Sequence, residues 1–170
     1  MSELILPVVT LFRFNSELLS LTLADVSPEG ANRRLKEGQG SSIAYLTGHL
    51  MSSRYGLMKT LGAAREKPFK ELFGAGVGSK DAPDYPPFDK LRKSWTDTSK
   101  RFHAALDAID AEQALAPGPD SFPIPDQTLR GNLTFIAWHE SYHVGQIGIM
   151  RTEMGYRSMR QALSAARQQS

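Results

Sequence analysis

Two of the four histidines lie four residues apart, in the segment WHESYH at positions 138–143. On a helix, residues at this spacing share a face, with their Cβ atoms roughly 5–6 Å apart. Two imidazoles so placed can bind one metal ion at nitrogen–metal distances of about 2.0–2.1 Å. Ile147 and Met150 lie on the same face as His139 and His143, which directs both rings into the protein, where an unpartnered polar ring is unfavourable. The pair predicts either a metal site or two hydrogen-bonded core histidines.

A third histidine, His49, lies between the apolar positions Leu46 and Leu50 of an earlier helical segment. If the two segments are antiparallel neighbours, helix rises of roughly 12 and 18 Å from their ends bring all three rings to a similar depth. His49 therefore favours the metal site. The fourth histidine, His103, lies one residue off an apolar stripe, so we expect it at a boundary or in solvent.

The HExxH pattern of residues 139–143 also matches zinc peptidases, with Glu140 as the general base. A metzincin needs glycine at position 146 and histidine at position 149, where this chain has Gln146 and Ile149. The other common zincin pattern takes a glutamate from a separate downstream helix. The only acidic residue after position 143 is Glu153, on the same predicted helix. The chain is therefore not expected to be a peptidase.

Four long segments carry the apolar periodicity of amphipathic helices, and none carries a strand alternation. The segments span roughly residues 4–25, 41–62, 88–109 and 128–155, and a short basic tail follows. The Gly- and Pro-rich residues 62–87 are too many for a tight hairpin, so they predict a long crossover with no core of its own. We therefore predict an all-α protein, a four-helix bundle forming one domain over residues 1–170.

The composition of the chain bears on its possible partners and on its location in the cell. With 20 basic and 18 acidic residues, the formal charge of +2 gives no argument for nucleic acid or an anionic membrane. The absence of cysteine excludes disulfides and thiolate metal ligands. No stretch approaches the ~18 uncharged apolar residues of a spanning helix, and the apolar run at 4–12 lacks the features of a secretory signal. We expect a cytoplasmic protein.

The motif HESYHVGQI at 139–147, the later Arg151 and Gly155, and the stretch around His49 resemble the DinB/YfiT-like superfamily of metalloenzymes. Residues 25–28 and 85–88 are similar to the family's connecting segments, so the resemblance covers nearly the whole chain. It implies a four-helix bundle in up-down-down-up order and frequent homodimers. It also implies a divalent metal held by His49, His139 and His143. Because imidazole suits late divalent ions, we expect zinc or nickel, one ion per chain. Some relatives are transferases or isomerases that use low-molecular-weight thiols, and many have no established activity.

Three further polar residues are candidates for the site. Gln146, three residues after His143, is expected to contact the ligands or line a pocket, or else to make a capping or interhelical bond. Asn15 is a polar residue on an apolar stripe and therefore needs a hydrogen-bond partner. We expect it to border the site. Glu140 either acts on the substrate, orients His49, or makes a structural bond between helices.

Three functions remain open. The first is an enzyme whose three-histidine metal has an open position that activates water or a thiol, giving a hydrolase or a thiol transferase. The second is a non-catalytic protein in which the metal joins two helices, and the third is a metal-free bundle. Without cysteine or a Ser-His-acid arrangement, the attacking group is expected to come from the metal. The partners expected are a small-molecule substrate or thiol and a second copy of the chain, with Phe12, Phe14 and Met58 as exposed apolar candidates.

Overall fold

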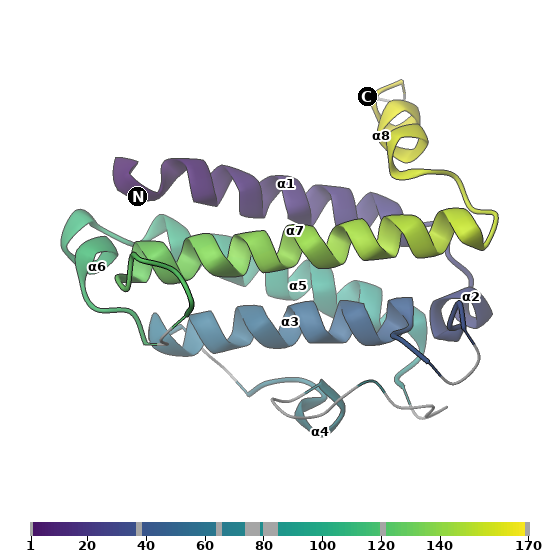
Figure 1. The fold of residues 1–170 in the computed structure, drawn as a ribbon, viewed down its shortest axis with the longest axis horizontal. Helices are drawn as coiled ribbons and strands as arrows, with labels where there is room; N and C mark the ends of the chain where they lie inside the picture. Colours follow the sequence, from purple (N-terminus) through teal and green to yellow (C-terminus); the bar gives the residue numbers. More distant parts are fainter. Residues whose placement is uncertain are drawn as a thin grey trace.

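The computed structural model describes residues 2–36, 39–63, 66–73, 79, 85–119 and 122–168. Four long helices lie side by side (Figure 1): α1 (Leu6–Leu23), α3 (Ile43–Thr60), α5 (Phe88–Asp107) and α7 (Leu129–Glu153). Helices α1 and α3 each pack against both α5 and α7. Within the described ranges there is no β-strand, and the prediction of an all-α protein is confirmed.

The core lies between the four helices and follows the predicted apolar stripe most closely on α5. The stripe residues of this helix are buried along its whole length: Phe88, Leu91, Trp95, Thr98 and Phe102. Because these positions recur at steps of three and four, they form one continuous face toward the other helices. The third predicted helix is therefore confirmed in both its extent and its inward face.

The apolar stripe that the sequence predicts for residues 4–25, through Leu4, Val8, Leu11, Leu18 and Thr22, is only partly buried. Ile5, just before α1, and Phe12 and Leu19 are fully buried, whereas Leu4 and Leu11 remain 42% and 38% exposed. Each exposed leucine precedes a buried residue by one position and so lies about 100° around the helix from it. Since apolar residues occupy more than half of this helix's circumference, the periodicity alone did not fix its rotation.

Polar contacts tie the ends of α1 to α5. The guanidinium of Arg13 forms an ion pair with Asp107 in the last turn of α5, at 2.7 Å. At the other end, Arg92 in the second turn of α5 donates to the carbonyl oxygens of Leu23 and Ala24, at 3.1 and 2.8 Å. The start of α5 therefore lies beside the end of α1.

The helix ends follow the expected capping chemistry. Ser42 is the N-cap of α3, and its side chain accepts a hydrogen bond from the Tyr45 backbone N–H. Thr128 caps α7 in the same way. The chain leaves α3 through Gly62 at φ +67° and leaves α7 through Gly155 at φ +85°, in the left-handed region that glycine adopts without strain.

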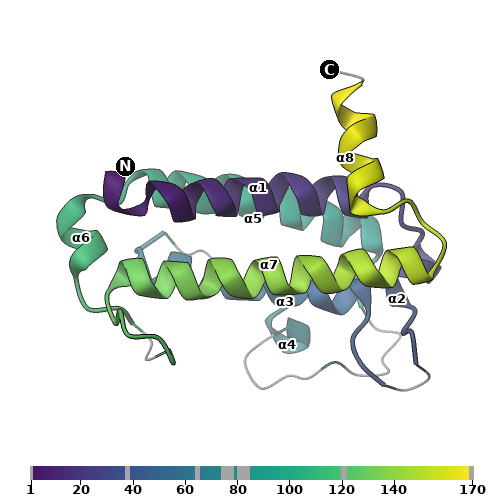
Figure 2. The ribbon, with the colours of Figure 1, turned by 45° about the horizontal axis from the view of Figure 1, so that its top comes forward.

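Shorter helices fill the connections: η1 (Glu3–Ile5), α2 (Pro28–Asn32), α4 (Lys70–Phe73), α6 (Ala111–Leu115) and α8 (Met159–Arg167). The short basic tail expected after the fourth long helix contains α8, which begins with a capping box between Ser158 and Gln161. Figure 2 shows α8 projecting away from the bundle. The long connection also contributes to the core of the bundle, because Phe73 of α4 is only 2% exposed.

Among the described residues, one helical segment is long and apolar enough to cross a membrane, the run Glu3–Leu23, whose most apolar window has a mean hydropathy of 1.4. Because the run contains Glu3, Arg13 and Glu17, it is not an uncharged apolar stretch of ~18 residues. A core helix and a signal sequence meet the same criteria of length and composition. In this structure 44% of that 18-residue window is buried, and α1 packs against α5 and α7.

Candidate metal centre

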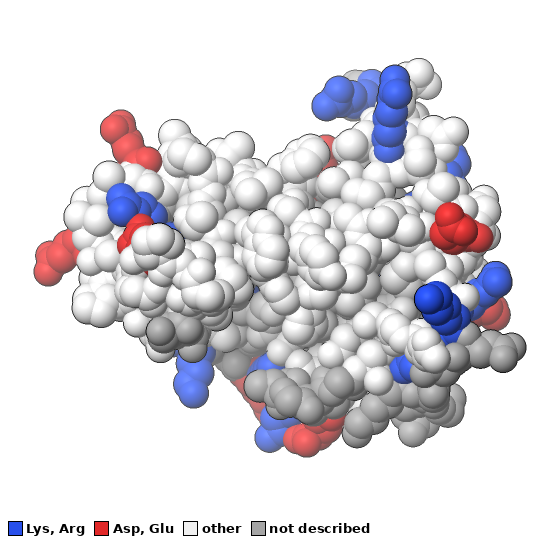
Figure 3. Space-filling model, viewed as in Figure 1, with Lys and Arg blue, Asp and Glu red and all other residues white. Residues whose placement is uncertain are grey.

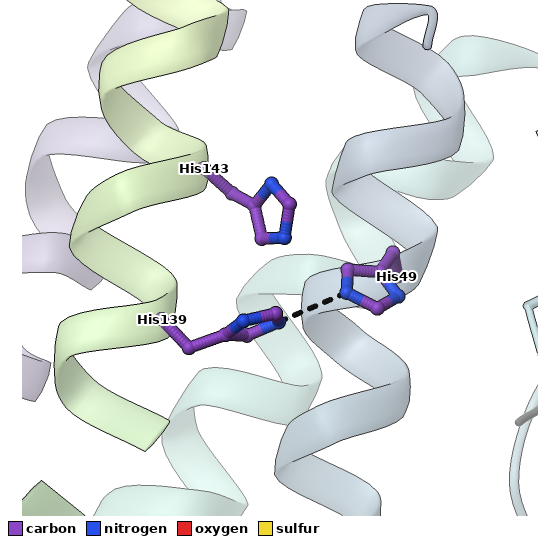
Figure 4. Close-up of side chains that lie close together, drawn as sticks. All are labelled: His49, His139 and His143. Atoms are coloured by element: carbon purple, nitrogen blue, oxygen red, sulfur yellow. Dashed lines mark hydrogen bonds between the residues drawn. The ribbon is translucent and has the colours of Figure 1, made fainter. Parts of the chain in front are cut away.

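Three histidine rings from two neighbouring helices converge on one point (Figure 4). His49 extends from α3, and His139 and His143 extend from successive turns of α7. The Nε2 atoms of His49 and His139 are 2.9 Å apart, and one nitrogen from each of the three rings lies within 4.8 Å of the other two. All three rings are half-buried. The structure therefore brings together the three ligands implied by the sequence.

The geometry of this histidine triad fits a single metal ion. Nitrogens bound at about 2.0–2.1 Å to one tetrahedral zinc ion lie roughly 3–4 Å from each other. The observed separations bracket this range, so small rotations of the rings meet it. No fourth His, Cys, Asp or Glu of the described residues belongs to the group. Three neutral ligands and an open fourth position are typical of catalytic zinc sites, whereas structural sites have four protein ligands.

Gln146 selects the tautomer of His143. Its side-chain oxygen lies 2.6 Å from Nδ1 of that ring, and its amide nitrogen donates to the Tyr142 hydroxyl at 3.0 Å. Because the amide donates to Tyr142, its oxygen faces His143 and accepts a hydrogen bond from Nδ1–H. The lone pair of His143 is then on Nε2, which faces the other rings (Figure 4). This is the arrangement by which outer residues orient metal-binding histidines.

We predict that Gln146→Ala lowers metal affinity about 10- to 100-fold, the usual cost of losing such an orienting partner. Competition with a chromophoric chelator measures the affinity. Tyr142→Phe is the matched control, because it removes only the bond that orients the amide, and a smaller loss is expected. Wild-type affinity in Gln146→Ala would show that the hydrogen bond has no role in binding.

The surroundings of the triad keep its imidazoles neutral. Burial, followed by the charges of His143, His139 and Lys67, lowers the pKa of His49 to about 4. Burial and the neighbouring His143 lower the pKa of His139. Burial also lowers the pKa of His143, although the bond to Gln146 opposes the shift. Since only neutral imidazole binds metal, the site is ready for a cation at neutral pH.

These shifts predict a pH-dependent stability of the metal-free protein. An unfolded histidine takes up a proton near pH 6.5, whereas His49 in the folded chain does so only near pH 4. The unfolded chain thus binds more protons in this window, and the free energy of unfolding falls as the pH drops from about 6.5 toward 4. Denaturant unfolding at several pH values measures it. His49→Phe should show a shallower dependence, and an unchanged slope in this variant would contradict the shift.

Glu140 does not join the triad. Its carboxylate is fully buried and forms an ion pair with Arg54 of α3, with Nε–Oε1 at 2.5 Å and Nη2–Oε2 at 2.9 Å. Both carboxylate oxygens are occupied by this pair, so the structure gives Glu140 the interhelical bond that was one of its predicted alternatives. This ion pair does not support the candidate catalytic role of Glu140. It also occupies the carboxylate that would be the general base of the HExxH pattern.

Asn15 and His103 both make structural contacts away from the triad. The Asn15 amide is buried and donates to the Ser141 hydroxyl on α7 at 3.0 Å. It therefore links α1 to α7, and the hydrogen bonds described for it reach Ala137 and Ser141 of α7 but not a histidine of the triad. His103 is half-buried, as expected of a boundary position, and its Nε2 lies 3.0 Å from the Ser16 hydroxyl.

An aromatic cluster beside His49 was missed by the sequence reasoning. Tyr45 stacks on the His49 ring at a centroid distance of 5.9 Å, and Phe73 and Tyr85 pack against Tyr45. Gly48 makes this possible, because a Cβ atom there would lie 2.4 Å from the Phe73 ring. The long connection before α5 therefore covers α3 next to a metal ligand. A glycine directly before a histidine was the one sequence signal for this contact.

The other two glycines near the site lie on α7. A Cβ atom on Gly148 would lie 2.3 Å from the sulfur of Met159, so Gly148 allows α8 to approach α7. Gly145 has no such neighbour. Both line a groove of about 400 Å³ between α7 and the start of α8.

A family model describes most of this chain. The DinB superfamily matches residues 11–147, a range that includes all three histidines of the triad. The chain belongs to the DinB superfamily. None of the curated proteins matches it. The match ends before α8, so the C-terminal helix and the groove beside it are features of this DinB-superfamily protein that lie mostly outside the matched region.

Proposed function

We propose that this DinB-superfamily protein is a metal-dependent enzyme, with zinc or nickel held by His49, His139 and His143. The observation that carries the proposal is the convergence of three histidine nitrogens within 4.8 Å, with no fourth protein ligand among the described residues. Imidazole suits these late divalent ions better than magnesium or calcium. A non-catalytic metal protein is the alternative, and the absence of a fourth protein ligand favours the enzyme.

The charge around the triad supports activation of an added group. When bound, the ion would supply a positive charge that lowers the pKa of a water or a thiol at the open position. The three imidazoles are neutral and do not compensate the charge of the ion. The carboxylate of Glu140, which directly follows His139, is neutralised by Arg54. Lys67, whose charge also acts on His49, adds to the positive potential. A hydroxide or a thiolate would therefore be favoured there.

Cobalt substitution tests the open position. We expect 2-mercaptoethanol to shift the ligand-field bands of the cobalt-loaded protein, because sulfur binding changes the coordination of the ion. Ethylene glycol, which carries a hydroxyl in place of the thiol, serves as the control for an effect of the additive that does not involve sulfur. Unchanged bands at saturating thiol would remove the thiol-transferase function and leave a hydrolase or a non-catalytic metal protein.

We propose further that the helices follow the up-down-down-up order within one domain of 1–170. The Arg13–Asp107 and Arg92–Leu23 contacts support antiparallel α1 and α5. The hydrogen bond from Arg54 to Ser99 and that from Arg101 to Tyr55 support parallel α3 and α5, as a crossover requires. The Asn15–Ser141 bond and the Arg151–Asp25 pair support parallel α1 and α7, because Asp25, just after α1, and Arg151 each lie further along the chain than Asn15 and Ser141.

A second copy of the chain is the partner we propose for the face formed by α1 and α7. On α7 the large side chains Trp138, Tyr142 and Ile149 are 57%, 53% and 64% exposed, and on α1 Phe14 is 45% exposed. The middle of this face carries no charged side chain in Figure 3. Such a broad apolar surface is typical of an interface. Of the three apolar candidates named from sequence, Phe14 is exposed, whereas Phe12 and Met58 are buried in the core.

We predict a homodimer, with about twice the 18.8 kDa mass of one chain in sedimentation at micromolar concentration. Trp138→Glu should yield monomers, because a charge would be buried in the apolar interface. Leu115→Glu, at an exposed apolar residue on α6, is the matched control and should remain dimeric. A monomeric wild-type protein would refute the proposed interface.

A further inference from the structure

An ion pair lies inside the bundle at the level of the histidine triad. Arg54 follows His49 by five residues on α3, and Glu140 directly follows His139 on α7. Both side chains are fully buried. Two hydrogen bonds join them, at 2.5 and 2.9 Å, one from Nε and one from Nη2 of Arg54. The pair therefore connects the two helices that carry the triad, close to the ligands on each.

Arg54 also reaches the other two long helices. Its Nη1 donates to the Ser99 hydroxyl of α5 at 2.8 Å, and its Nη2 donates to the Ser16 hydroxyl of α1 at 2.8 Å. The guanidinium lies 4.1 Å from the centroid of the Trp95 ring. The side chain of Arg54 thus joins α3 to the other three long helices, and these contacts fix the position of its guanidinium.

A gain in the stability of the fold does not explain why this buried ion pair is present. The desolvation of two buried charges offsets much of their attraction, and apolar pairs of similar volume are often as stable or more so. Apolar surfaces, however, can pack in several registers. A planar guanidinium bound to both oxygens of a carboxylate has a single geometry and therefore fixes the relative position of the helices that carry it.

We propose that Arg54 and Glu140 are positioning residues of the metal centre, which fix the register of α3 against α7 and so the distance of His49 from His139 and His143. The inference rests on the metal site proposed above. Neither residue touches the triad in the described hydrogen bonds, so the pair acts only through the two helices.

The test replaces both charges at once, with Arg54→Met and Glu140→Leu. Ser99 and Ser16 keep their bonds to the carbonyl oxygens of Trp95 and Phe12, so no buried hydroxyl is orphaned. We expect the metal-free double variant to unfold at the same denaturant concentration as the wild type, or a higher one. Its metal dissociation constant should rise about 10- to 100-fold, with shifted cobalt bands. A merely structural pair would not separate stability from metal affinity in this way.

Asp25→Asn is the matched control. It weakens a second pair with a fully buried arginine, Asp25–Arg151, which lies two helical turns beyond His143. This variant should lose stability and keep wild-type metal affinity.

Wild-type affinity and cobalt bands in the double variant would overturn the proposal. If that variant does not fold, Arg54→Leu with Glu140→Met repeats the test with the side-chain volumes exchanged. A wild-type protein that binds no metal would instead refute the metal site itself.

Discussion

Alanine at His49, His139 or His143 will lower the affinity for zinc or nickel by more than about 100-fold. Each substitution removes one of three ligands, and this loss exceeds the 10- to 100-fold cost of an outer orienting partner. Because the rings converge from two helices, the substitution on α3 should be as damaging as either one on α7. Chelator competition on the purified variants measures the three affinities.

His103→Ala is the control for these substitutions. Its ring is half-buried and hydrogen-bonded to Ser16, and it is outside the group of converging nitrogens. Metal affinity should therefore remain at the wild-type value. Full affinity in His49→Ala would contradict the bridge between α3 and α7, even if both α7 variants lost their metal.

The second large effect concerns stability. Breaking the buried pair from one side, with Arg54→Ala or Glu140→Ala, should lower the free energy of unfolding by about 3–5 kcal/mol, because the remaining charge is buried without its partner. Denaturant unfolding of the metal-free protein measures the change. Arg13→Ala, which breaks an ion pair whose side chains are 49% and 46% exposed, should cost less than about 1 kcal/mol. Equal losses in the buried and exposed pairs would contradict the account.

The long helices could be predicted from the sequence because each carries several turns of apolar residues. Their ends were marked by local chemistry, with Ser42 at the start of α3 and Gly62 just after its end. The rotation of α1 could not be predicted, since Leu4 and Leu11 are as apolar as the buried Phe12. Helix α8 was missed although the sequence held a signal for it, the capping pair of Ser158 and Gln161 at the start of a nine-residue amphipathic segment.

The triad was predictable for a different reason. Histidines four residues apart must share a helical face, and a third histidine on an apolar stripe points inward as well. The partner of Glu140 was not predicted, although the sequence held a signal: Arg54 lies four residues after Leu50 and three before Leu57, on the apolar stripe of α3. A charged residue on such a stripe needs a buried partner, but which helix supplies it depends on packing.

The metal content of the purified protein tests the central claim most directly. The protein should be prepared without chelator and analysed by elemental mass spectrometry, before and after reconstitution with zinc or nickel. The account predicts close to one equivalent of a late divalent metal per chain, with the same preparation of the His49→Ala variant nearly empty. A wild-type chain that remains free of metal after reconstitution would contradict the assignment of His49, His139 and His143 as ligands.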